Sequence, residues 1–139
     1  MEMIHPIYIV GDFWYRGTSD GAVHIVRQLK GRKHLIIGNH DRRFLKNSAF
    51  REGFVEVADI LDLAYDGKRM ILCHYPFAEW DGFFRGSWHI YGHIHNSRNE
   101  AFDYLRTKER ALNAGVDITQ YMPVTFDELK QYNEAFKNA

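Results

Sequence analysis

Histidine, aspartate and asparagine side chains stand directly after several short apolar runs of this 139-residue chain. Each apolar run predicts a buried strand that ends at a loop. Ligands collect at the carboxyl ends of neighbouring strands in α/β sheets, so we expect these side chains to meet at one edge of a sheet. The candidate metal ligands are Asp12, Asn39, His74, His93 and His95.

This mixture of donors favours one class of metal. Imidazole nitrogen with hard oxygen ligands suits Mn, Fe, Zn, Co or Ni better than calcium, and such a site needs no thiolate. His93 and His95 are one residue apart, and alternate side chains of an extended segment point to the same side. The two imidazoles therefore predict a place for one divalent transition-metal ion, or for one each of two adjacent ions.

The first half of the chain predicts a β-α-β unit that positions the first two donors. Residues 7–10 and 33–37 are apolar runs typical of strands. Between them lies a helical pattern that begins at Ser19 or Asp20, either of which can cap a helix, and that ends before Gly31. A β-α-β order favours a parallel pair of strands joined by a crossover helix.

From residue 55 onward the pattern changes to short strands. They are predicted at residues 55–58, 61–65, 69–73, 88–91 and 111–114. Residues 66–67 form a hairpin-turn signal, and residues 77–87 are an aromatic loop whose rings either stack a nucleobase or pack against the sheet. Residues 100–110 show no clear preference, and Thr125 opens a final helix with a capping box. Together these elements predict one α/β domain over residues 1–139.

Composition excludes several classes of protein. Lys and Arg number 18 and Asp and Glu number 18, which argues against non-specific nucleic-acid binding. The single Cys73 cannot form an internal disulfide and suggests a reducing compartment. No stretch approaches the ~18 consecutive apolar residues of a membrane span, and residues 1–4 lack the pattern of a signal peptide. We therefore expect a cytoplasmic protein.

Four motifs, in this order, resemble those of the calcineurin-like metallophosphoesterase superfamily. They are Gly11-Asp12, Gly38-Asn39-His40-Asp41, His74-Tyr75-Pro76 and Gly92-His93-Ile94-His95. The resemblance covers nearly the whole chain and extends to small bacterial phosphohydrolases around Trp80, Trp88 and Asn113. It implies a β-sandwich flanked by helices, in four αββα layers, with two metals at the carboxyl edge. It also implies a metal-dependent phosphoric ester hydrolase acting on a phosphodiester or a small phosphorylated, nucleotide-type substrate.

The same resemblance assigns a role to each donor. Asp12 would bridge two metal ions. Asn39, His74 and His93 would complete the site of one ion, and His95 would contribute to the other. A carboxylate can span two cations about 4 Å apart, which then clamp the attacking and leaving oxygens of an in-line displacement.

Three further residues are implied as catalytic or substrate-binding groups. His40 would be the general acid or a transition-state contact, and Asp41 is a candidate to orient it. Because phosphoryl transfer depends on positioning and charge neutralisation, Arg16, four residues after Asp12, is a candidate to hold a phosphate oxygen. A solvated loop arginine is an equally natural interpretation of Arg16.

The chain departs from the family before Asp12. The first motif of the family, Asp-x-His after an N-terminal strand, has no match there, because Trp14 stands where the histidine is needed and His5 precedes the strand. We therefore expect a member that lacks its first strand, its first helix and half of one metal site. The alternatives to an active enzyme are a catalytically impaired protein that binds one metal and a partner-binding remnant.

The expected loss of a strand also predicts an association. Residues 7–10 would expose backbone donors and an apolar face at the edge of the sheet. Pairing with the same strand of a second copy would satisfy both edges and give a two-fold homodimer.

Overall fold

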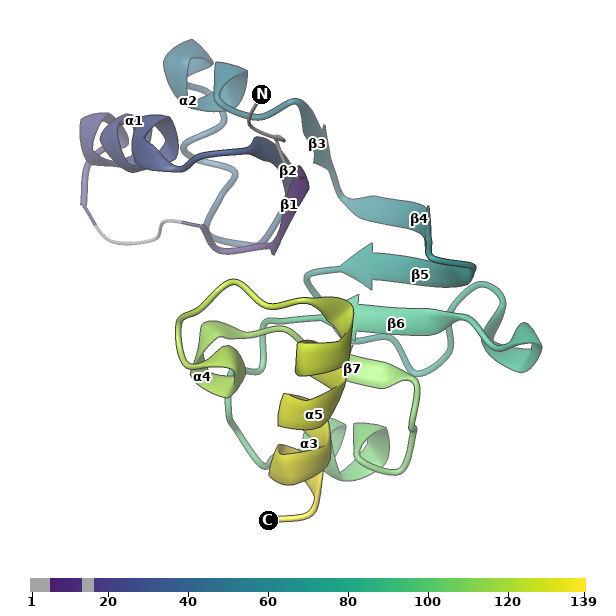
Figure 1. Cartoon of the computed structure of the whole chain (residues 1–139). Helices are drawn as coiled ribbons and strands as arrows, with labels where there is room; N and C mark the ends of the chain where they lie inside the picture. The colour runs from purple at the N-terminus through teal and green to yellow at the C-terminus, as the bar shows by residue number, and fades with distance from the viewer. Residues whose placement is uncertain (1–5, 14–16) are drawn as a thin grey trace.

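Strands of the computed structural model, which describes residues 6–13 and 17–139, form two sheets with helices packed against them (Figure 1). The first sheet is parallel throughout. Its order is β1 (Pro6–Val10), β2 (Arg32–Ile36), β3 (Glu56–Ala58). The second sheet has the order β4 (Ile60–Tyr65), β5 (Lys68–Cys73), β6 (Trp88–Tyr91), β7 (Ala111–Asn113). Only its β4–β5 pair is antiparallel.

The helices surround these sheets, and four of them begin at side-chain caps. They are α1 (Ser19–Gln28), α2 (Ser48–Glu52), a 3-10 turn (Phe83–Arg85), α3 (Glu100–Leu105), α4 (Val116–Thr119) and α5 (Phe126–Lys137). The N-cap of α1 is Thr18 rather than the expected Ser19 or Asp20, and the Thr18 hydroxyl accepts the backbone N–H of Gly21. At α5 the predicted capping box is confirmed: Thr125 and Glu128 each accept the other's backbone N–H.

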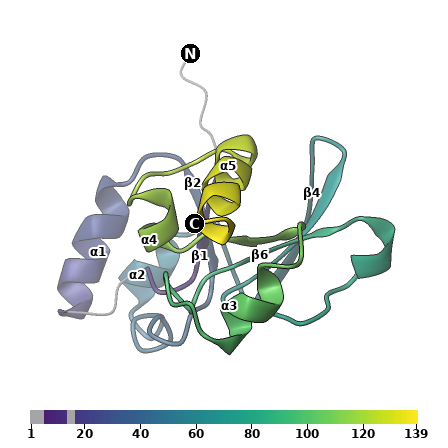
Figure 2. The ribbon, with the colours of Figure 1, turned by 90° about the horizontal axis from the view of Figure 1, so that it is seen from below.

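Three apolar clusters hold the elements together, and the alternation of side chains along each strand decides which cluster a residue joins. Leu35 faces α1 and α2, whereas the next residue, Ile36, packs with residues of the second sheet such as Leu72. Ile71 faces away from the first sheet and packs against Phe102 of α3. Figure 2 shows the result, with α1 on one side of β1 and β2 and the strand β4 on the other.

The predicted short strands of the second half are confirmed at nearly the expected positions. Asp66 and Gly67, with φ of 51° and 73°, form the turn between β4 and β5. The ambiguous stretch 100–110 contains α3, and the short helix α4 was not expected from the sequence. In the aromatic loop, Trp80 is buried and its indole N–H donates to the carbonyl of Ser87, so this ring packs rather than stacking a ligand.

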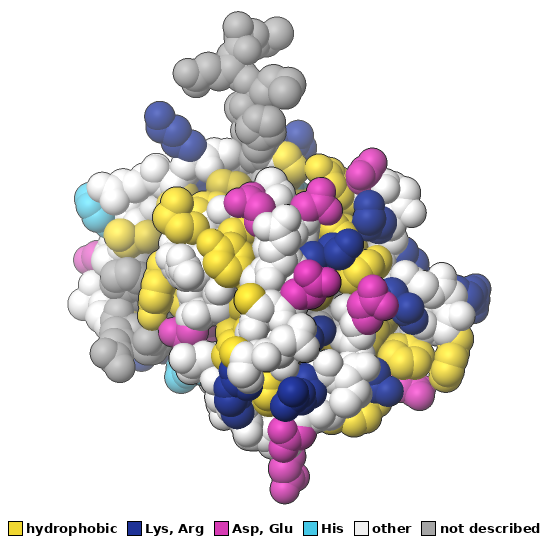
Figure 3. All heavy atoms as spheres, turned by 60° about the horizontal axis from the view of Figure 1, so that its bottom comes forward, with side chains coloured by type: hydrophobic (Ala, Val, Ile, Leu, Met, Phe, Trp, Pro, Cys, Tyr) yellow, Lys and Arg dark blue, Asp and Glu magenta, His cyan; other side chains and the backbone are white. Residues whose placement is uncertain are grey.

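Basic and acidic side chains are mixed across the face of the molecule that Figure 3 shows. None of the helices in the described residues is long and apolar enough to cross a membrane. β1 is an edge strand that pairs with β2 in the described part of the chain. Its pairing with a second copy stays a prediction, and a folded monomer at high protein concentration in light scattering would contradict it.

Candidate metal centre

Four of the predicted donors stand just beyond the carboxyl ends of strands, as expected. Asp12 follows β1 and Asn39 follows β2, whereas His74 follows β5 and His93 follows β6. Parallel pairing within each sheet brings the ends of β1 and β2 together, and likewise those of β5 and β6. The two sheets meet at this same edge, because the ring of His74 contacts the last residue of β1, Val10.

Glycine permits this close approach. A Cβ atom at Gly11, which has a φ of 83°, would overlap the ring of His74. A Cβ atom at Gly38 would lie 2.5 Å from the backbone nitrogen of Asp12. Because any larger side chain would push the strand ends apart, the glycines before the donors are a steric condition for the cluster.

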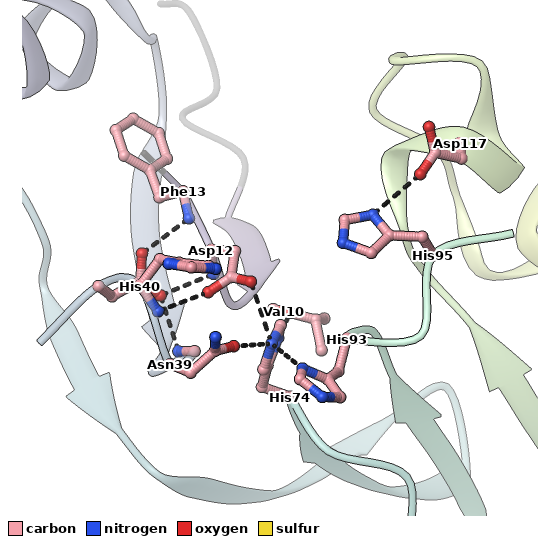
Figure 4. A network of polar contacts seen from close by, with 11 residues as sticks. Val10, Asp12, Phe13, Asn39, His40, His74, His93, His95 and Asp117 are labelled. Atoms are coloured by element: carbon pink, nitrogen blue, oxygen red, sulfur yellow. Dashed lines mark hydrogen bonds and ion pairs between the residues drawn. The ribbon is translucent and has the colours of Figure 1, made fainter. Parts of the chain in front are cut away.

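His74 lies at the centre of the cluster, and only 2% of its side chain is exposed. Its Nδ1–H donates to the carbonyl of Val10 at 3.0 Å. Its Nε2 lies 3.0 Å from Oδ1 of Asn39, 3.3 Å from Oδ2 of Asp12 and 3.3 Å from Nδ1 of His93 (Figure 4). Asn39 and His93 are exposed, so the cluster is open to solvent on one side.

The chemistry of these contacts calls for a cation. Because the Nδ1 proton is committed to a carbonyl, neutral His74 presents a lone pair at Nε2. The Asp12 carboxylate and the Asn39 amide oxygen present lone pairs to the same atom, and these groups repel one another unless positive charge lies between them. A proton on Nε2 supplies that charge, and so does a metal ion. Ligands ~2.1 Å from one transition-metal ion lie ~3.0–3.4 Å from each other, which is the range of separations here. The donor set therefore fits a metal ion.

The donors contact one another directly around a single atom, Nε2 of His74. When only His, Cys, Asp and Glu are counted, residues 6–13 and 17–139 contain no group of three or more arranged to hold a metal ion. Asp12, His74 and His93 are of those types, so their side chains as placed do not form such a group, and the fourth donor is the Asn39 oxygen. The fit of the cluster to a metal thus rests on the donors that approach Nε2 and on their charges.

Backbone strain marks the same residues. Asp12, His93 and His95 have φ of 54°, 65° and 53°. These values lie in the left-handed region of backbone conformation, which residues other than glycine rarely adopt. Such a conformation costs about 1–3 kcal/mol per residue and persists where the surrounding structure enforces it. All three residues are candidate metal ligands, so the strain coincides with the expected chemistry.

The side chain of Asp41 connects the segments that follow β1 and β2. It is fully buried, and its carboxylate accepts backbone N–H bonds from Asp12 at 2.7 Å, Phe13 at 2.8 Å and Gly38 at 2.7 Å. Burial raises the pKa of Asp41, and these three N–H donors oppose that shift. Asp41 thus holds the backbone of Asp12 in position. The expected role of Asp41 in orienting His40 stays a prediction.

His40 and His93 lie at the exposed side of the cluster. The backbone N–H of His40 donates to Oδ1 of Asp12 at 2.9 Å, which fixes the second oxygen of that carboxylate. Desolvation lowers the pKa of His93, and the neighbouring His74 adds to the effect. A lowered pKa keeps the His93 imidazole neutral over a wider pH range, which is the form that binds a metal.

The structure does not bring His95 into this cluster. Its ring points to Asp117, with Nδ1 3.0 Å from Oδ2 of that carboxylate (Figure 4). The expectation that His93 and His95 lie in one extended segment with their side chains on the same side is wrong, because left-handed φ values at both residues turn the chain. Asp117 was missed from the sequence, where it lies 22 residues from His95 outside every motif. The only nearby feature of the sequence that could have pointed to Asp117 as a functional residue is its position shortly after a short strand and a glycine.

Some predicted positions lie outside the described residues. They are Arg16, Trp14 and His5. The proposed contact of Arg16 with a phosphate oxygen therefore stays a prediction.

Comparisons with known proteins show relatives without an assigned activity. No family model matches the chain. The chain is 27% identical over 122 residues to uncharacterized protein MJ1445 of Methanocaldococcus jannaschii, a match that covers 87% of this chain and 61% of that protein. The chain thus spans about three fifths of the length of this curated relative. It is also similar to the crystal structure of the protein of unknown function AQ665 from Aquifex aeolicus, with a TM-score of 0.67 and 27% identity over 91% of this chain and 75% of that one.

Proposed function

We propose that the chain is a metal-dependent phosphoesterase that hydrolyses a phosphodiester or a small phosphorylated, nucleotide-type molecule. The observation that carries this proposal is the convergence of Asp12, Asn39 and His93 on Nε2 of His74. The order of the strand-end motifs, which resembles that of the calcineurin-like metallophosphoesterases, supplies the reaction class.

The metal would be held by the four donors that meet at Nε2 of His74. They are Asp12, Asn39, His74 and His93. This nitrogen and oxygen set suits Mn, Fe, Zn, Co or Ni. When bound, such an ion neutralises phosphate charge and makes water a nucleophile at neutral pH. The chain's own part is to hold the donors in place, through Val10 at the His74 ring and Asp41 beneath Asp12.

His40 is the proposed general acid. The backbone N–H of His40 donates to Asp12, and His40 is exposed to solvent at the open side of the cluster. A histidine there can donate a proton to the leaving oxygen as the phosphorus–oxygen bond breaks, which avoids release of an alkoxide.

The packing of the chain supports the four-layer αββα architecture as part of this proposal. One apolar cluster lies between the helices α1 and α2 and the first sheet, a second is shared by the two sheets and Leu129 of α5, and a third packs the far face of the second sheet against α3 and Phe136 of α5. These clusters have the order helices, sheet, sheet, helices that the resemblance implies.

A one-metal binding protein with little hydrolytic activity is the second candidate. It is favoured by the separation of His95, which pairs with Asp117 rather than joining the donors around His74. With Asp12 and His95 alone as protein ligands, a second ion would be held weakly.

Metal analysis and a phosphodiesterase assay test the proposal together. Chelator-treated protein titrated with Mn²⁺ should bind nearer one ion per chain than two, and His93→Ala should abolish that binding. His24→Ala is a matched control, because this exposed α1 histidine contacts Gln28 and lies outside the cluster. Slow Mn²⁺-stimulated hydrolysis of an activated phosphodiester is expected. Absence of metal binding, or binding unaffected by His93→Ala, contradicts the assignment of the centre. Metal binding without hydrolysis favours the one-metal protein.

A further inference from the structure

His93 reaches the donor cluster from the loop of residues 92–95, which follows β6 (Figure 4). Nδ1 of His93 lies 3.3 Å from Nε2 of His74. His93 and His95 have φ of 65° and 53°, and left-handed values at such residues are retained where packing or hydrogen bonds require them. Contacts with other parts of the chain must therefore hold the loop in this conformation.

The side chain of Asn113 makes one of these contacts. Asn113 is the last residue of β7, the edge strand beside β6. Its Nδ2–H donates to the carbonyl of His95 at 2.8 Å, and its Oδ1 accepts the backbone N–H of Gly115 at 2.8 Å. A carbonyl can only accept and an N–H can only donate, so these two partners determine which end of the amide faces the loop.

Asn113 is itself held in place from both sides. Asn133 of α5 accepts the backbone N–H of Asn113 at 2.7 Å and donates to its carbonyl at 3.0 Å, as a neighbouring strand would. Both asparagines are 2% exposed. Each backbone and side-chain polar atom of Asn113 has a partner, so a displacement of this buried amide would leave polar groups unpaired at a cost in free energy.

The other end of the loop is held as well. The backbone N–H of Gly92 donates to the carbonyl of His74 at 2.9 Å. Between the two ends, Ile94 is buried in an apolar cluster of the second sheet. Apolar packing has no preferred direction, so it keeps the loop close to the sheet without setting the rotation of its backbone. The hydrogen bonds at Gly92 and His95 supply that direction, and His93 lies between them.

We propose that Asn113 is a positioning residue of the candidate centre. By binding the carbonyl of His95, its amide fixes residues 92–95 in the conformation that brings His93 to Nε2 of His74. The use of this arrangement in metal binding rests on the proposed function, whereas the placement of His93 beside His74 rests on contacts within the chain. Asn113 acts through the backbone of the loop.

Proton NMR of the metal-free protein at fixed pH tests the placement of His93. The ring of His93 lies 4.7 Å from that of Tyr75 and 5.1 Å from that of His74, measured between centroids, so ring currents shift its carbon-bound protons. Asn113→Ala removes the donor to the His95 carbonyl and should move these shifts towards those of an unstructured histidine.

Asn47→Ala is the matched control. It removes an asparagine that accepts the backbone N–H of Phe50 at 3.2 Å and caps α2, which packs on the first sheet. It should lower the urea midpoint of unfolding and leave the His93 shifts unchanged.

Gly115→Ala perturbs the Asn113 amide in a variant whose backbone accepts the new side chain. Gly115 has a φ of −60°, and a Cβ atom there would lie 3.0 Å from Oδ1 of Asn113. The amide must give way by a small distance, which lengthens its bond to the loop. The His93 shifts should therefore move in the same direction as in Asn113→Ala, and by less.

Calorimetry with Mn²⁺ alone tests the connection to the metal. Asn113→Ala should weaken Mn²⁺ binding about 10- to 100-fold, as loss of a group that orients a ligand generally does, and Asn47→Ala should bind as the wild type does. Three results overturn the inference: unchanged His93 shifts in Asn113→Ala (or in Gly115→Ala where the first variant does not fold), an equal change in Asn47→Ala, or full Mn²⁺ affinity in Asn113→Ala. If the wild type binds no Mn²⁺, the proposed metal function fails, and the His93 shifts still decide whether Asn113 positions the loop.

Discussion

His74 and His95 are both candidate metal ligands, and the structure fixes their rings by different partners. His74 is buried and donates its Nδ1–H to a backbone carbonyl, that of Val10. His95 is exposed and donates to the side chain of Asp117. Nε2 of His74 is crowded by acceptors, among them the Asp12 carboxylate, whereas Nε2 of His95 stands outside that cluster.

This difference shows how the two rings can be perturbed. The partner of His74 belongs to the backbone of β1, so no side-chain substitution removes it and only a displacement of the strand can break the contact. The partner of His95 is a side chain, so a single substitution can remove it without moving a strand. The centre around His74 should therefore respond to steric changes at the strand ends, and that around His95 to changes of hydrogen-bonding groups.

Gly11→Ala should give the largest effect. The new Cβ would overlap the ring of His74 and would adopt a φ of 83°, so both a clash and backbone strain are introduced. Left-handed backbone costs roughly 1–2 kcal/mol and overpacking about 1–3 kcal/mol, so the free energy of unfolding should fall by roughly 2–5 kcal/mol with loss of metal binding. Denaturant titration and Mn²⁺ calorimetry measure the two effects.

Gly67→Ala is the matched control for that substitution. Gly67 has a φ of 73°, but a Cβ atom there would meet no other atom within 4 Å. It should show the backbone cost alone and retain metal binding. Equal losses in the two variants would mean that the contact between Gly11 and His74 has no role in the centre.

His40→Ala should reduce catalysis without emptying the centre. The bond from His40 to Asp12 uses the backbone N–H, which alanine retains, so Mn²⁺ affinity should stay near that of the wild type. Loss of a general acid lowers turnover by about 10²-fold or more. Steady-state kinetics with an activated phosphodiester, together with calorimetry, separates the two quantities. Unchanged turnover would remove His40 from the mechanism.

His89 offers the smallest effect and a contrast with both candidate ligands, because both of its ring nitrogens are used inside the protein. Its Nδ1–H donates to the carbonyl of Ile71 at 2.9 Å, and its Nε2 accepts the backbone N–H of Phe77 at 3.0 Å. The residue is fully buried, and this burial lowers its pKa. The folded state therefore holds His89 neutral at pH values where the unfolded chain binds a proton.

Stability should consequently fall as the pH falls below the ordinary histidine pKa of about 6.5. Above that value both states are neutral and His89 contributes no pH dependence. Below it the unfolded state binds one more proton, so the free energy of unfolding decreases by up to about 1.4 kcal/mol per pH unit until the lowered pKa of the folded state is reached. Urea titrations of the wild type and of His89→Gln between pH 8 and pH 5 measure this slope. An equal slope in both proteins would assign the pH dependence to other groups.

The sequence by itself determined the strands and the donors at their ends. Apolar runs closed by glycine or histidine predicted β1, β2, β5 and β6 at nearly the observed positions, because the signals of a strand and of its end lie within a few consecutive residues. The capping box at Thr125 is equally local and is confirmed. Parallel pairing places Asp12 near Asn39 in the first sheet and His74 near His93 in the second, and the packing of the two sheets brings these pairs together.

Only the tertiary structure decided what each donor contacts. The N–H bonds from Asp12 and Phe13 to Asp41, and the pairing of His95 with Asp117, join segments that lie far apart in the chain. No local pattern encodes them, because a hydrogen bond between residues 22 or 28 positions apart requires the fold to bring two distant segments together. Residue types and spacing fix which groups arrive at the edge, and packing fixes which of their atoms face one another.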